Sequence, residues 1–278
     1  MVRPETTEET ASFYSRVAPR YAEEGPPYFA HAGRQLVEVA QVRPGHVVLD
    51  LGTGRGAVLL PAARRVGPGG RAIGVDIATE MLAHTRRTLE AEQLAHASVQ
   101  LMDVSALEFE SAQFTHVLSS FAVFFFTDLP AVLRNVRQLL HPNGVAGFAF
   151  SRSADLRWRW YEQLLRDSGA LTGLPEPRGY PRIREPGILG GLLEASGFID
   201  VVELEEPTEI WYASPEAWWA SLWAHGSRRP LERMAPELLA RVKTEALRRA
   251  RELADQQGVL ERMQLVYVLA RTGAGVCS

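Results

Sequence analysis

The chain has 278 residues and a formal net charge of −3, and 46% of its residues are hydrophobic. This composition is typical of a globular protein that is long enough for one large domain, or for one domain with a cap. The single cysteine, Cys277, excludes an internal disulfide and a zinc site built from several cysteines. The slight acidity gives no electrostatic argument for a nucleic-acid partner, which normally needs a basic face.

Two further absences in the sequence narrow the function and the location. The only lysine, Lys243, stands outside any Gly-Lys-Ser/Thr sequence, which excludes a phosphate-binding P-loop and argues against Schiff-base chemistry. No stretch approaches the roughly 20 apolar residues that span a bilayer. The first ten residues are polar and acidic, unlike a secretory signal. We therefore predict a cytoplasmic protein with no membrane partner and no metal site.

In chain order, two helices come first, over residues 10–21 and 28–40. Short apolar runs suited to buried strands then alternate with amphipathic helical patterns of about 10–15 residues, and this alternation is typical of βαβ units with a parallel sheet. The predicted strands are 46–51, 71–76, 98–102, 114–120 and 145–150, and the predicted helices between them are 57–66, 79–92 and 129–140.

The pattern changes after residue 150. Residues 154–168 are predicted as a helix and 173–187 as a proline-rich loop. Further along, the chain predicts helices over 187–196 and 236–256, strands over 198–212 and 263–271, and a helix opened by Ser214-Pro215, a favourable N-cap followed by proline at the first helical position. The predicted fold class is α/β, with a Rossmann-like, seven-stranded, mostly parallel sheet and a helical cap.

A glycine-rich turn follows the first predicted strand. Gly52, Gly54 and Gly56 allow the backbone to bend sharply and a ligand to lie against it. Asp76 ends the second strand, where an acid can accept hydrogen bonds from two ribose hydroxyls. Asp103 follows the third strand and can accept from an exocyclic amino group such as that of adenine. A turn without any ligand is the alternative, but two acids beside a glycine loop indicate a nucleoside pocket.

The spacing of the glycines separates the possible nucleoside cofactors. Dinucleotide loops read Gly-x-Gly-x-x-Gly and place a pyrophosphate at the helix N-terminus. Here the spacing is Gly-x-Gly-x-Gly, and Asp50 precedes it. An acid in this turn repels phosphates and suits the ammonium group of an amino-acid moiety.

The sequence resembles the class I S-adenosylmethionine-dependent methyltransferases. The resemblance rests on this loop, on Asp76 with the following Met81-Leu82, on Asp103 and on the turn Pro142-Asn143-Gly144. The chain is most similar to the small-molecule branch that contains the ubiquinone and menaquinone biosynthesis methyltransferases. The resemblance covers roughly residues 13–150, and residues 13–21 look like the N-terminal lid helix of that branch.

The resemblance implies a role for each matching residue. The three glycines line the methionine part of S-adenosylmethionine, and Asp50 lies near its amino group. Asp76 holds the ribose hydroxyls, and Asp103 with the Val104 backbone meets the adenine ring. The remaining predicted cofactor-binding residues are Ile77 and Met81 beside the adenine, Ser119 near the methionine tail, and Tyr21 on the first helix. Ile77 and Met81 have core packing as an equal alternative.

The fourth strand departs from the family pattern. Relatives commonly start it with aspartate, where this chain has His116, and the loop after it is apolar over 123–126 instead of carrying a histidine pair. No catalytic base is therefore carried over. His225 is the candidate base in the second half, since histidine titrates near neutral pH; a surface or helix-end histidine is the alternative.

The predicted substrate-binding residues are aromatic. Tyr14 and Tyr21 can face either cofactor or substrate, and we assign Tyr14 to the substrate. All six tryptophans fall between residues 158 and 223. Trp218 and Trp219 are adjacent on one helix, so one of them is expected to face a cavity. The full predicted set is Tyr14, Phe121, Phe125, Trp218, Trp219 and Trp223.

The sequence thus predicts methyl transfer from S-adenosylmethionine to a small, apolar or aromatic molecule, a secondary metabolite or a quinone-like ring. Oxygen is favoured as the acceptor over carbon and nitrogen. The alternatives are an S-adenosylmethionine-binding protein with a non-methylating reaction and a nicotinamide-dependent oxidoreductase. The predicted organisation is lid helices (1–42), a cofactor-binding core (43–152) and a remainder (153–278) with cap inserts at about 153–186 and 213–258, in a monomer or homodimer.

Overall fold

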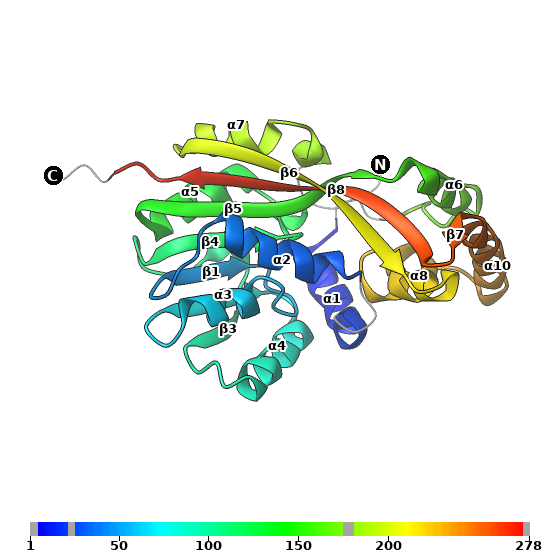
Figure 1. Cartoon of the computed structure of the whole chain (residues 1–278), viewed down its shortest axis with the longest axis horizontal. Helices are drawn as coiled ribbons and strands as arrows, with labels where there is room; N and C mark the ends of the chain where they lie inside the picture. The colour runs from blue at the N-terminus through cyan, green and yellow to red at the C-terminus, as the bar shows by residue number, and fades with distance from the viewer. Residues whose placement is uncertain (1–4, 22–25, 175–180, 275–278) are drawn as a thin grey trace.

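The computed structural model describes residues 5–21, 26–174 and 181–274, and one sheet runs through its centre (Figure 1). Its strands are β1 (Val47–Leu51), β2 (Arg71–Asp76), β3 (Ala97–Leu101), β4 (Phe114–Ser120), β5 (Leu140–Ala154), β6 (Ile199–Tyr212), β7 (Ala254–Asp255) and β8 (Gly258–Arg271). They stand in the order β3-β2-β1-β4-β5-β8-β6, with β7 paired to β8 alone. β1 to β5 are parallel, and β8 is antiparallel to both β5 and β6. The predicted Rossmann-like, mostly parallel sheet is confirmed.

Helices pack on both faces of the sheet, as the near-continuous apolar strands require. One face is covered by α2 (Tyr28–Val39), α3 (Leu59–Val66) and α4 (Thr79–Ala91). The other face is covered by α5 (Leu129–Leu139) and α7 (Ile188–Ala195). Short 3-10 turns follow β3 and β4: η1 (Val104–Ala106) and η2 (Val123–Phe125).

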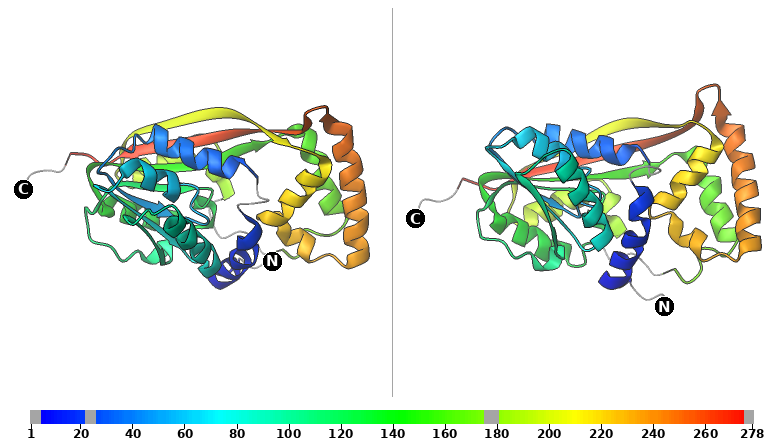
Figure 2. Two further views of the ribbon diagram at one scale, coloured as in Figure 1. Left: turned by 60° about the horizontal axis from the view of Figure 1, so that its bottom comes forward. Right: turned by 90° about the horizontal axis from the view of Figure 1, so that it is seen from below.

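A second group of helices forms the cap at the far end of the long strands. It contains α6 (Arg159–Asp167), α8 (Pro215–Ser221), the 3-10 turn η5 (Leu222–Ala224), α9 (Arg228–Glu232) and α10 (Pro236–Leu253). The N-terminal helix α1 (Thr7–Tyr21) lies between core and cap, in contact with α4 on one side and η5 on the other (Figure 2). The remaining short turns are η3 (Leu156–Trp158) and η4 (Pro181–Arg184).

The strands near the edge are longer than predicted. β5 and β8 were expected over 145–150 and 263–271, but they extend to Leu140–Ala154 and Gly258–Arg271. An apolar run marks only the part of a strand that is buried on both faces, whereas the ends of these strands lie beyond that core. The predicted helix over 154–168 consequently starts only at Arg159. Residues 175–180 of the predicted loop lie outside the described residues.

The long strands join the core and the cap without a linker. β5 pairs with β8 from Val145 opposite Arg271 to Ala154 opposite Met263. β6 and β8 continue together past this point, until Tyr212 stands opposite Val259. This two-stranded arm carries the cap helices at its end, as Figure 1 shows.

The expectation that Trp218 or Trp219 faces a cavity is wrong. Their exposed fractions are 3% and 5%, and both belong to a buried cap cluster with Trp158. The reason is that α8 is covered on more than one side: it contacts α10, β6, β8 and η5. The predicted start of α8 is confirmed, since the Ser214 hydroxyl accepts a hydrogen bond from the Ala217 N–H at 3.1 Å and proline follows it.

Candidate functional site

A pocket opens at the carboxyl ends of β1, β2, β3 and β4, where open α/β sheets bind ligands. The glycine loop, the strand ends and η2 form its walls, and α1 contributes Thr7, Thr10, Tyr14 and Tyr21. Of the predicted cofactor residues, those that line it are Tyr21, Gly52, Gly54, Asp76, Ile77, Met81, Asp103 and Val104. The structure therefore brings together residues that are up to 83 positions apart in the sequence.

The glycine loop needs its glycines. Gly52, Gly54 and Gly56 have φ of +70°, +50° and +83°, a region that other residues rarely adopt. A Cβ on Gly52 would lie 2.4 Å from the Cβ of Ala122, so a side chain does not fit there. Gly54 lines the pocket, and a Cβ on it would meet no atom within 4 Å. The loop thus leaves room for a ligand directly beside Gly54.

Asp76 ties the loop to the end of β2. Its Oδ2 accepts a hydrogen bond from the Gly54 N–H and its Oδ1 accepts from the Ala78 N–H, both at 2.8 Å. Burial raises the pKa of Asp76, while these backbone hydrogen bonds oppose the rise. Each oxygen still has accepting capacity, so the carboxylate can bind a pair of hydroxyl groups.

Asp103 occupies the matching position after β3. Its Oδ1 accepts hydrogen bonds from the backbone N–H and the hydroxyl of Ser105, both at 2.8 Å, and these fix the carboxylate at the start of η1. Met102 and Val104 line the pocket beside it. Asp76 and Asp103 thus present two oriented carboxylates to one cavity.

Asp50, Gly56 and Ser119 do not line this pocket. Asp50 is 1% exposed and accepts a hydrogen bond from the Leu59 N–H at 3.1 Å, behind the loop. Burial raises the pKa of Asp50 to about 7. The Ser119 hydroxyl donates to the Leu51 carbonyl oxygen at 2.9 Å. In this structure these residues hold the strand ends and the loop in place.

Ser120 is a pocket residue that the sequence reasoning missed. Its Oγ is buried and has no hydrogen-bond partner in the described part of the chain, and the residue lines the pocket. Adjacent strand residues point to opposite faces, so the choice between Ser119 and Ser120 depended on the strand's orientation. Other missed residues that line the pocket are Thr7, Thr10, Met102, Ala122, Phe126 and Thr127.

Aromatic side chains form another part of the pocket wall. Tyr14 and Phe125 both line the pocket, with ring centroids 5.5 Å apart in an edge contact. Phe121 lines it too and contacts Tyr28 and Phe29 of α2, at 5.2 and 4.9 Å between centroids. Phe121 has φ of +55°, which is strained for a bulky residue, and its N–H donates to the Ala149 carbonyl oxygen at 2.8 Å. The tryptophans predicted for the substrate, Trp218, Trp219 and Trp223, do not line this pocket.

His225 lies beside this aromatic wall and does not line the pocket. Its ring centroid is 6.2 Å from that of Phe29, and a Cβ on the neighbouring Gly226 would be 3.8 Å from the Tyr14 hydroxyl. Burial lowers the pKa of His225 to about 4, so the imidazole is neutral at pH 7. A neutral imidazole can accept a proton.

His116 stands at the opposite end of β4 and cannot act in the pocket. Its Nε2 is 3.0 Å from the Ala40 carbonyl oxygen and its Nδ1 is 2.9 Å from Thr115 Oγ1. Its ring stacks on His46, with centroids 4.7 Å apart. Both ring nitrogens are thus occupied, which agrees with a structural role.

Within residues 5–21, 26–174 and 181–274, no group of three histidine, cysteine, aspartate or glutamate side chains is arranged to hold a metal ion. No helix in the described ranges is long and apolar enough to cross a membrane.

Comparison with known proteins places this site in a family. The family model described as "Methyltransferase domain" matches residues 48–144. Nocamycin O-methyltransferase from Saccharothrix syringae is 33% identical over 271 residues, which cover 93% of this chain and 96% of that protein. Aklanonic acid methyltransferase DauC from Streptomyces sp. (strain C5) is 33% identical over 141 residues, 51% of this chain and 61% of that protein.

Solved structures share the fold. The [4+2]-cyclase SpnF superposes with a TM-score of 0.62 at 17% identity, over 99% of this chain and 98% of that chain. The YcgJ protein from Bacillus subtilis has a TM-score of 0.59 at 16% identity, over 88% and 99% of the two chains. At these identities the likeness extends to the architecture and no further.

Proposed function

The chain belongs to the class I S-adenosylmethionine-dependent methyltransferases, and on that premise we propose that it methylates an oxygen atom of a small, apolar or aromatic molecule. The observation that carries the proposal is that one pocket is lined both by two oriented carboxylates beside a glycine loop and by an aromatic surface. A secondary metabolite or a quinone-like ring is the proposed class of acceptor.

The proposed cofactor contacts follow the geometry of the two carboxylates and the glycine loop. Asp76 accepts hydrogen bonds from the two ribose hydroxyls, and Asp103 accepts one from the adenine amino group. Ile77 and Met81 flank the adenine ring. The open space beside Gly54 accommodates the methionine part, with Tyr21 above it on α1. The bound cofactor supplies a methyl group on a sulfonium, which is already a strong electrophile.

The protein's own contribution is alignment and exclusion of water. Tyr14, Phe121 and Phe125 present apolar surface where the acceptor binds, and α1 covers the pocket. Holding the acceptor oxygen in line with the methyl group converts a bimolecular step into a unimolecular one, which lowers the entropic part of the barrier. The unpaired Ser120 hydroxyl is available to hydrogen-bond whatever occupies this part of the pocket.

A hydroxyl acceptor must lose its proton. We propose that His225 takes it, because its imidazole lies next to the aromatic wall; its pKa of about 4 makes it a weak base in the structure without a bound acceptor. An acceptor that is already ionised, such as an acidic phenol, needs no base. Replacement of His225 by glutamine separates these cases, since it slows methylation of weakly acidic hydroxyls and leaves acidic phenols unaffected.

Oxygen is favoured as the acceptor because of one relative. Nocamycin O-methyltransferase aligns along nearly all of both chains, including the cap that lies outside the matched family region. The second relative, aklanonic acid methyltransferase DauC, aligns with about half of this chain. Both names denote natural-product substrates, which supports a secondary metabolite as the acceptor.

Binding and turnover assays test the proposal in two steps. Asp76→Ala is expected to weaken the binding of S-adenosylmethionine and S-adenosylhomocysteine by about 1–3 kcal/mol, roughly 5- to 150-fold in Kd, through lost charged hydrogen bonds. Isothermal titration calorimetry measures this, with Asp167→Ala on the exposed side of α6 as the control. Unchanged affinity in a folded Asp76→Ala variant sinks the assignment.

The same assay separates the alternative functions. A nicotinamide-dependent oxidoreductase binds NAD(H) or NADP(H) in the same titration, whereas we expect no binding of either. A protein with a non-methylating reaction converts its substrate without forming S-adenosylhomocysteine. We expect S-adenosylhomocysteine and a product heavier by one methylene when hydroxylated naphthalenes and anthracenes are offered.

A further inference from the structure

Glu261 is a carboxyl group on the inward side of the arm that joins core and cap. It lies on β8 opposite Ile210 of β6, and on this side of the arm the neighbouring residues Ile210, Tyr212 and Val259 are all buried. On the outward side Glu209 and Arg262 form an exposed ion pair, with side-chain exposures of 52% and 57%. Glu261 therefore stands among buried residues at the cap end of this side of the arm.

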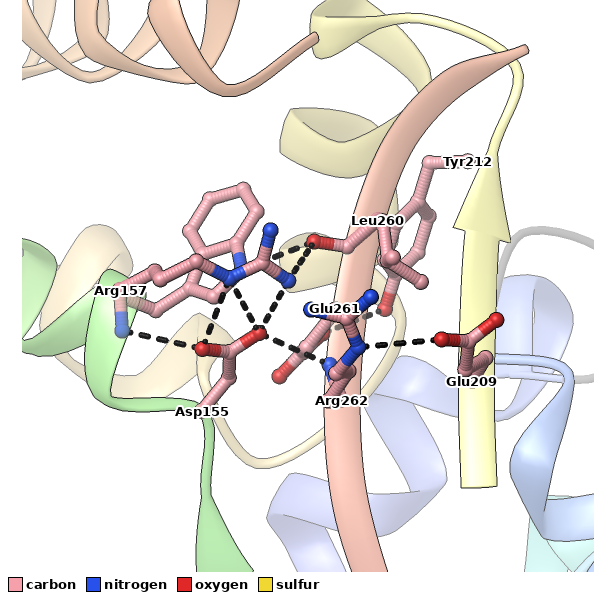
Figure 3. A network of polar contacts seen from close by, with 8 residues as sticks. Asp155, Arg157, Glu209, Tyr212, Leu260, Glu261 and Arg262 are labelled. Atoms are coloured by element: carbon pink, nitrogen blue, oxygen red, sulfur yellow. Dashed lines mark hydrogen bonds and ion pairs between the residues drawn. The ribbon is translucent and has the colours of Figure 1, made fainter. Parts of the chain in front are cut away.

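A single side chain holds Glu261 in place. The Tyr212 hydroxyl donates a hydrogen bond to Glu261 Oε2 at 3.1 Å, as Figure 3 shows. Among the described residues, Glu261 has no other hydrogen-bond donor and no cationic partner. The neighbouring carboxylate Asp155, by contrast, is paired with Arg157 and accepts from the Arg262 N–H. Burial raises the pKa of Glu261, which records the cost of an acid without a cation.

Glu261 is less buried than the residues around it. The residue is only half-buried, unlike its neighbours Ile210, Tyr212 and Val259. Tyr212 occupies one carboxyl oxygen, and no described group occupies the other. A carboxyl group held by one oxygen and open at the other is arranged to accept a hydrogen bond from a ligand.

Tyr28 connects Glu261 to the aromatic wall of the pocket. Its ring is 5.2 Å from that of Phe121, which lines the pocket, and it also packs against the cap cluster that contains Tyr212. Burial raises the pKa of Tyr28, and the charges of Tyr212 and Glu261 raise it further, so these groups lie within electrostatic reach of one another. Phe121, Tyr28 and the pair of Tyr212 with Glu261 thus form a series of neighbouring groups that starts at the pocket wall.

We propose that Glu261, positioned by Tyr212, determines substrate specificity by accepting a hydrogen bond from a hydroxyl or amino group of the acceptor molecule, at the end remote from the transferred methyl group. This inference rests on the proposed function, because it assigns one end of the acceptor to the pocket described above. It defines the acceptor more narrowly, as an extended ring system that carries a second hydrogen-bond donor far from the methylated oxygen.

Two matched probes test the proposal: 2,6-dihydroxynaphthalene and 6-methoxy-2-naphthol, which differ by one donating proton. Each is titrated calorimetrically into protein saturated with S-adenosylhomocysteine. The unaltered protein is expected to bind the diol about tenfold more tightly, because hydrogen bonds to charged groups are stronger than neutral ones. Glu261→Gln abolishes this preference, while Glu209→Gln on the outward side of the same arm keeps it.

The glutamine variant discriminates between two roles. Its amide oxygen still accepts the Tyr212 hydroxyl, so a purely structural Glu261 predicts no change in probe preference. Tyr212→Phe is the second variant and is expected to reduce the preference by freeing the carboxylate. Equal binding of both probes by the unaltered protein, absence of binding by either probe, or a preference that survives Glu261→Gln overturns the inference. Failure to bind S-adenosylhomocysteine instead overturns the proposed function.

Discussion

Asp50 and His116 are buried titratable residues whose pKa values are shifted by burial in opposite directions. Asp50 keeps its proton up to a pH of about 7, because burial penalises the carboxylate. His116 loses its proton already at about pH 4, because burial penalises the imidazolium. Each shift makes the stability of the fold depend on pH, and the two dependences have opposite sign.

The unaltered protein is expected to lose folding stability as the pH rises above 4, and Asp50→Asn is expected to abolish this loss. The pKa in the folded state is about 7, against an ordinary value of 3.8, so the folded state retains a proton that the unfolded state releases. The contribution is fully present below about pH 4 and is lost as the pH rises through 7, by roughly 4 kcal/mol. Urea unfolding of the cofactor-free protein between pH 4 and 8 measures this slope, and exposed Glu90→Gln serves as the control. An asparagine variant with the same slope contradicts the argument.

His116→Gln is expected to flatten the acid side of the stability profile. The folded-state pKa of about 4 lies below the ordinary 6.5, so the unfolded state takes up a proton first as the pH falls. Stability is therefore lost between about pH 6.5 and 4, by roughly 3 kcal/mol. The same unfolding series measures the loss of stability on the acid side. Identical slopes for the unaltered protein and the variant would exclude His116 as the cause of this loss.

At the residue scale, the sequence predicted which acidic residues meet at the carboxyl ends of the strands. Asp76 and Asp103 were identified because the carboxyl ends of parallel strands meet at one edge, and both line the pocket. Ser120 was missed because neighbouring strand positions differ only in side-chain direction. Glu261 carries a sequence signal, an acid in an alternating apolar strand, but its importance depends on Tyr212, 49 residues away.

At the element scale, α1 is the helix on which the pocket depends most. It supplies four pocket residues and is fixed to the cap by Arg229, which pairs with Glu5 and lies over the Phe13 ring at 4.0 Å. The Glu5 side chain is 4% exposed, so this pair is largely removed from water. The sequence predicted the helix but not this contact, which joins residues 224 positions apart.

Arg229→Ala is therefore expected to loosen α1 and weaken cofactor binding. Removal of one partner leaves the buried Glu5 carboxylate uncompensated, and about 1–3 kcal/mol of binding free energy should be lost. Stopped-flow dissociation of S-adenosylhomocysteine should become faster in proportion. Arg16→Ala is the matched control, because its ion pair with Glu232 joins the same helices but is half exposed. Equal dissociation rates for the two variants would mean that α1 does not depend on Arg229.

The strand lengths show why elements are easier to predict than their ends. Apolar runs located the centre of every long strand, because burial on both faces selects continuous hydrophobic residues. The residues that β5 and β8 add to the predicted ranges are mixed in polarity, so no apolar run marks them, whereas β6 was predicted over its full length. Their pairing is decided by partners far away in the sequence, such as Val259, 47 residues after Tyr212, and Met263, 109 residues after Ala154.

At the scale of the whole molecule, core and cap share one sheet. The division into 43–152 and 153–278 stays a prediction about organisation, and the continuous strands argue that the two parts unfold together. All tryptophans lie in residues 158–223, so tryptophan fluorescence reports on the second part, whereas far-UV circular dichroism reports on both.

The two signals are expected to give coincident urea transitions, and added S-adenosylhomocysteine should shift both by the same amount, because one cooperative unit shares the free energy of binding. The ligand shift is the internal control, since the proposed cofactor site contains no tryptophan. A fluorescence transition that precedes the circular dichroism transition and ignores the ligand would show that the cap unfolds independently.

The position of β8 between β5 and β6 also constrains how this fold can form during synthesis on the ribosome. The five parallel strands can pair as soon as β5 has been synthesised, but β6 has β8 as its strand partner in the described sheet. A nascent chain that stops at residue 257 therefore carries an unpaired β6 with Val202 and Leu204 uncovered, and these are 46% and 40% exposed even in the finished structure. Unpaired apolar strands invite aggregation. Synthesis of residues 258–271 is thus the step at which an aggregation-prone intermediate becomes a sheet in which β6 is paired.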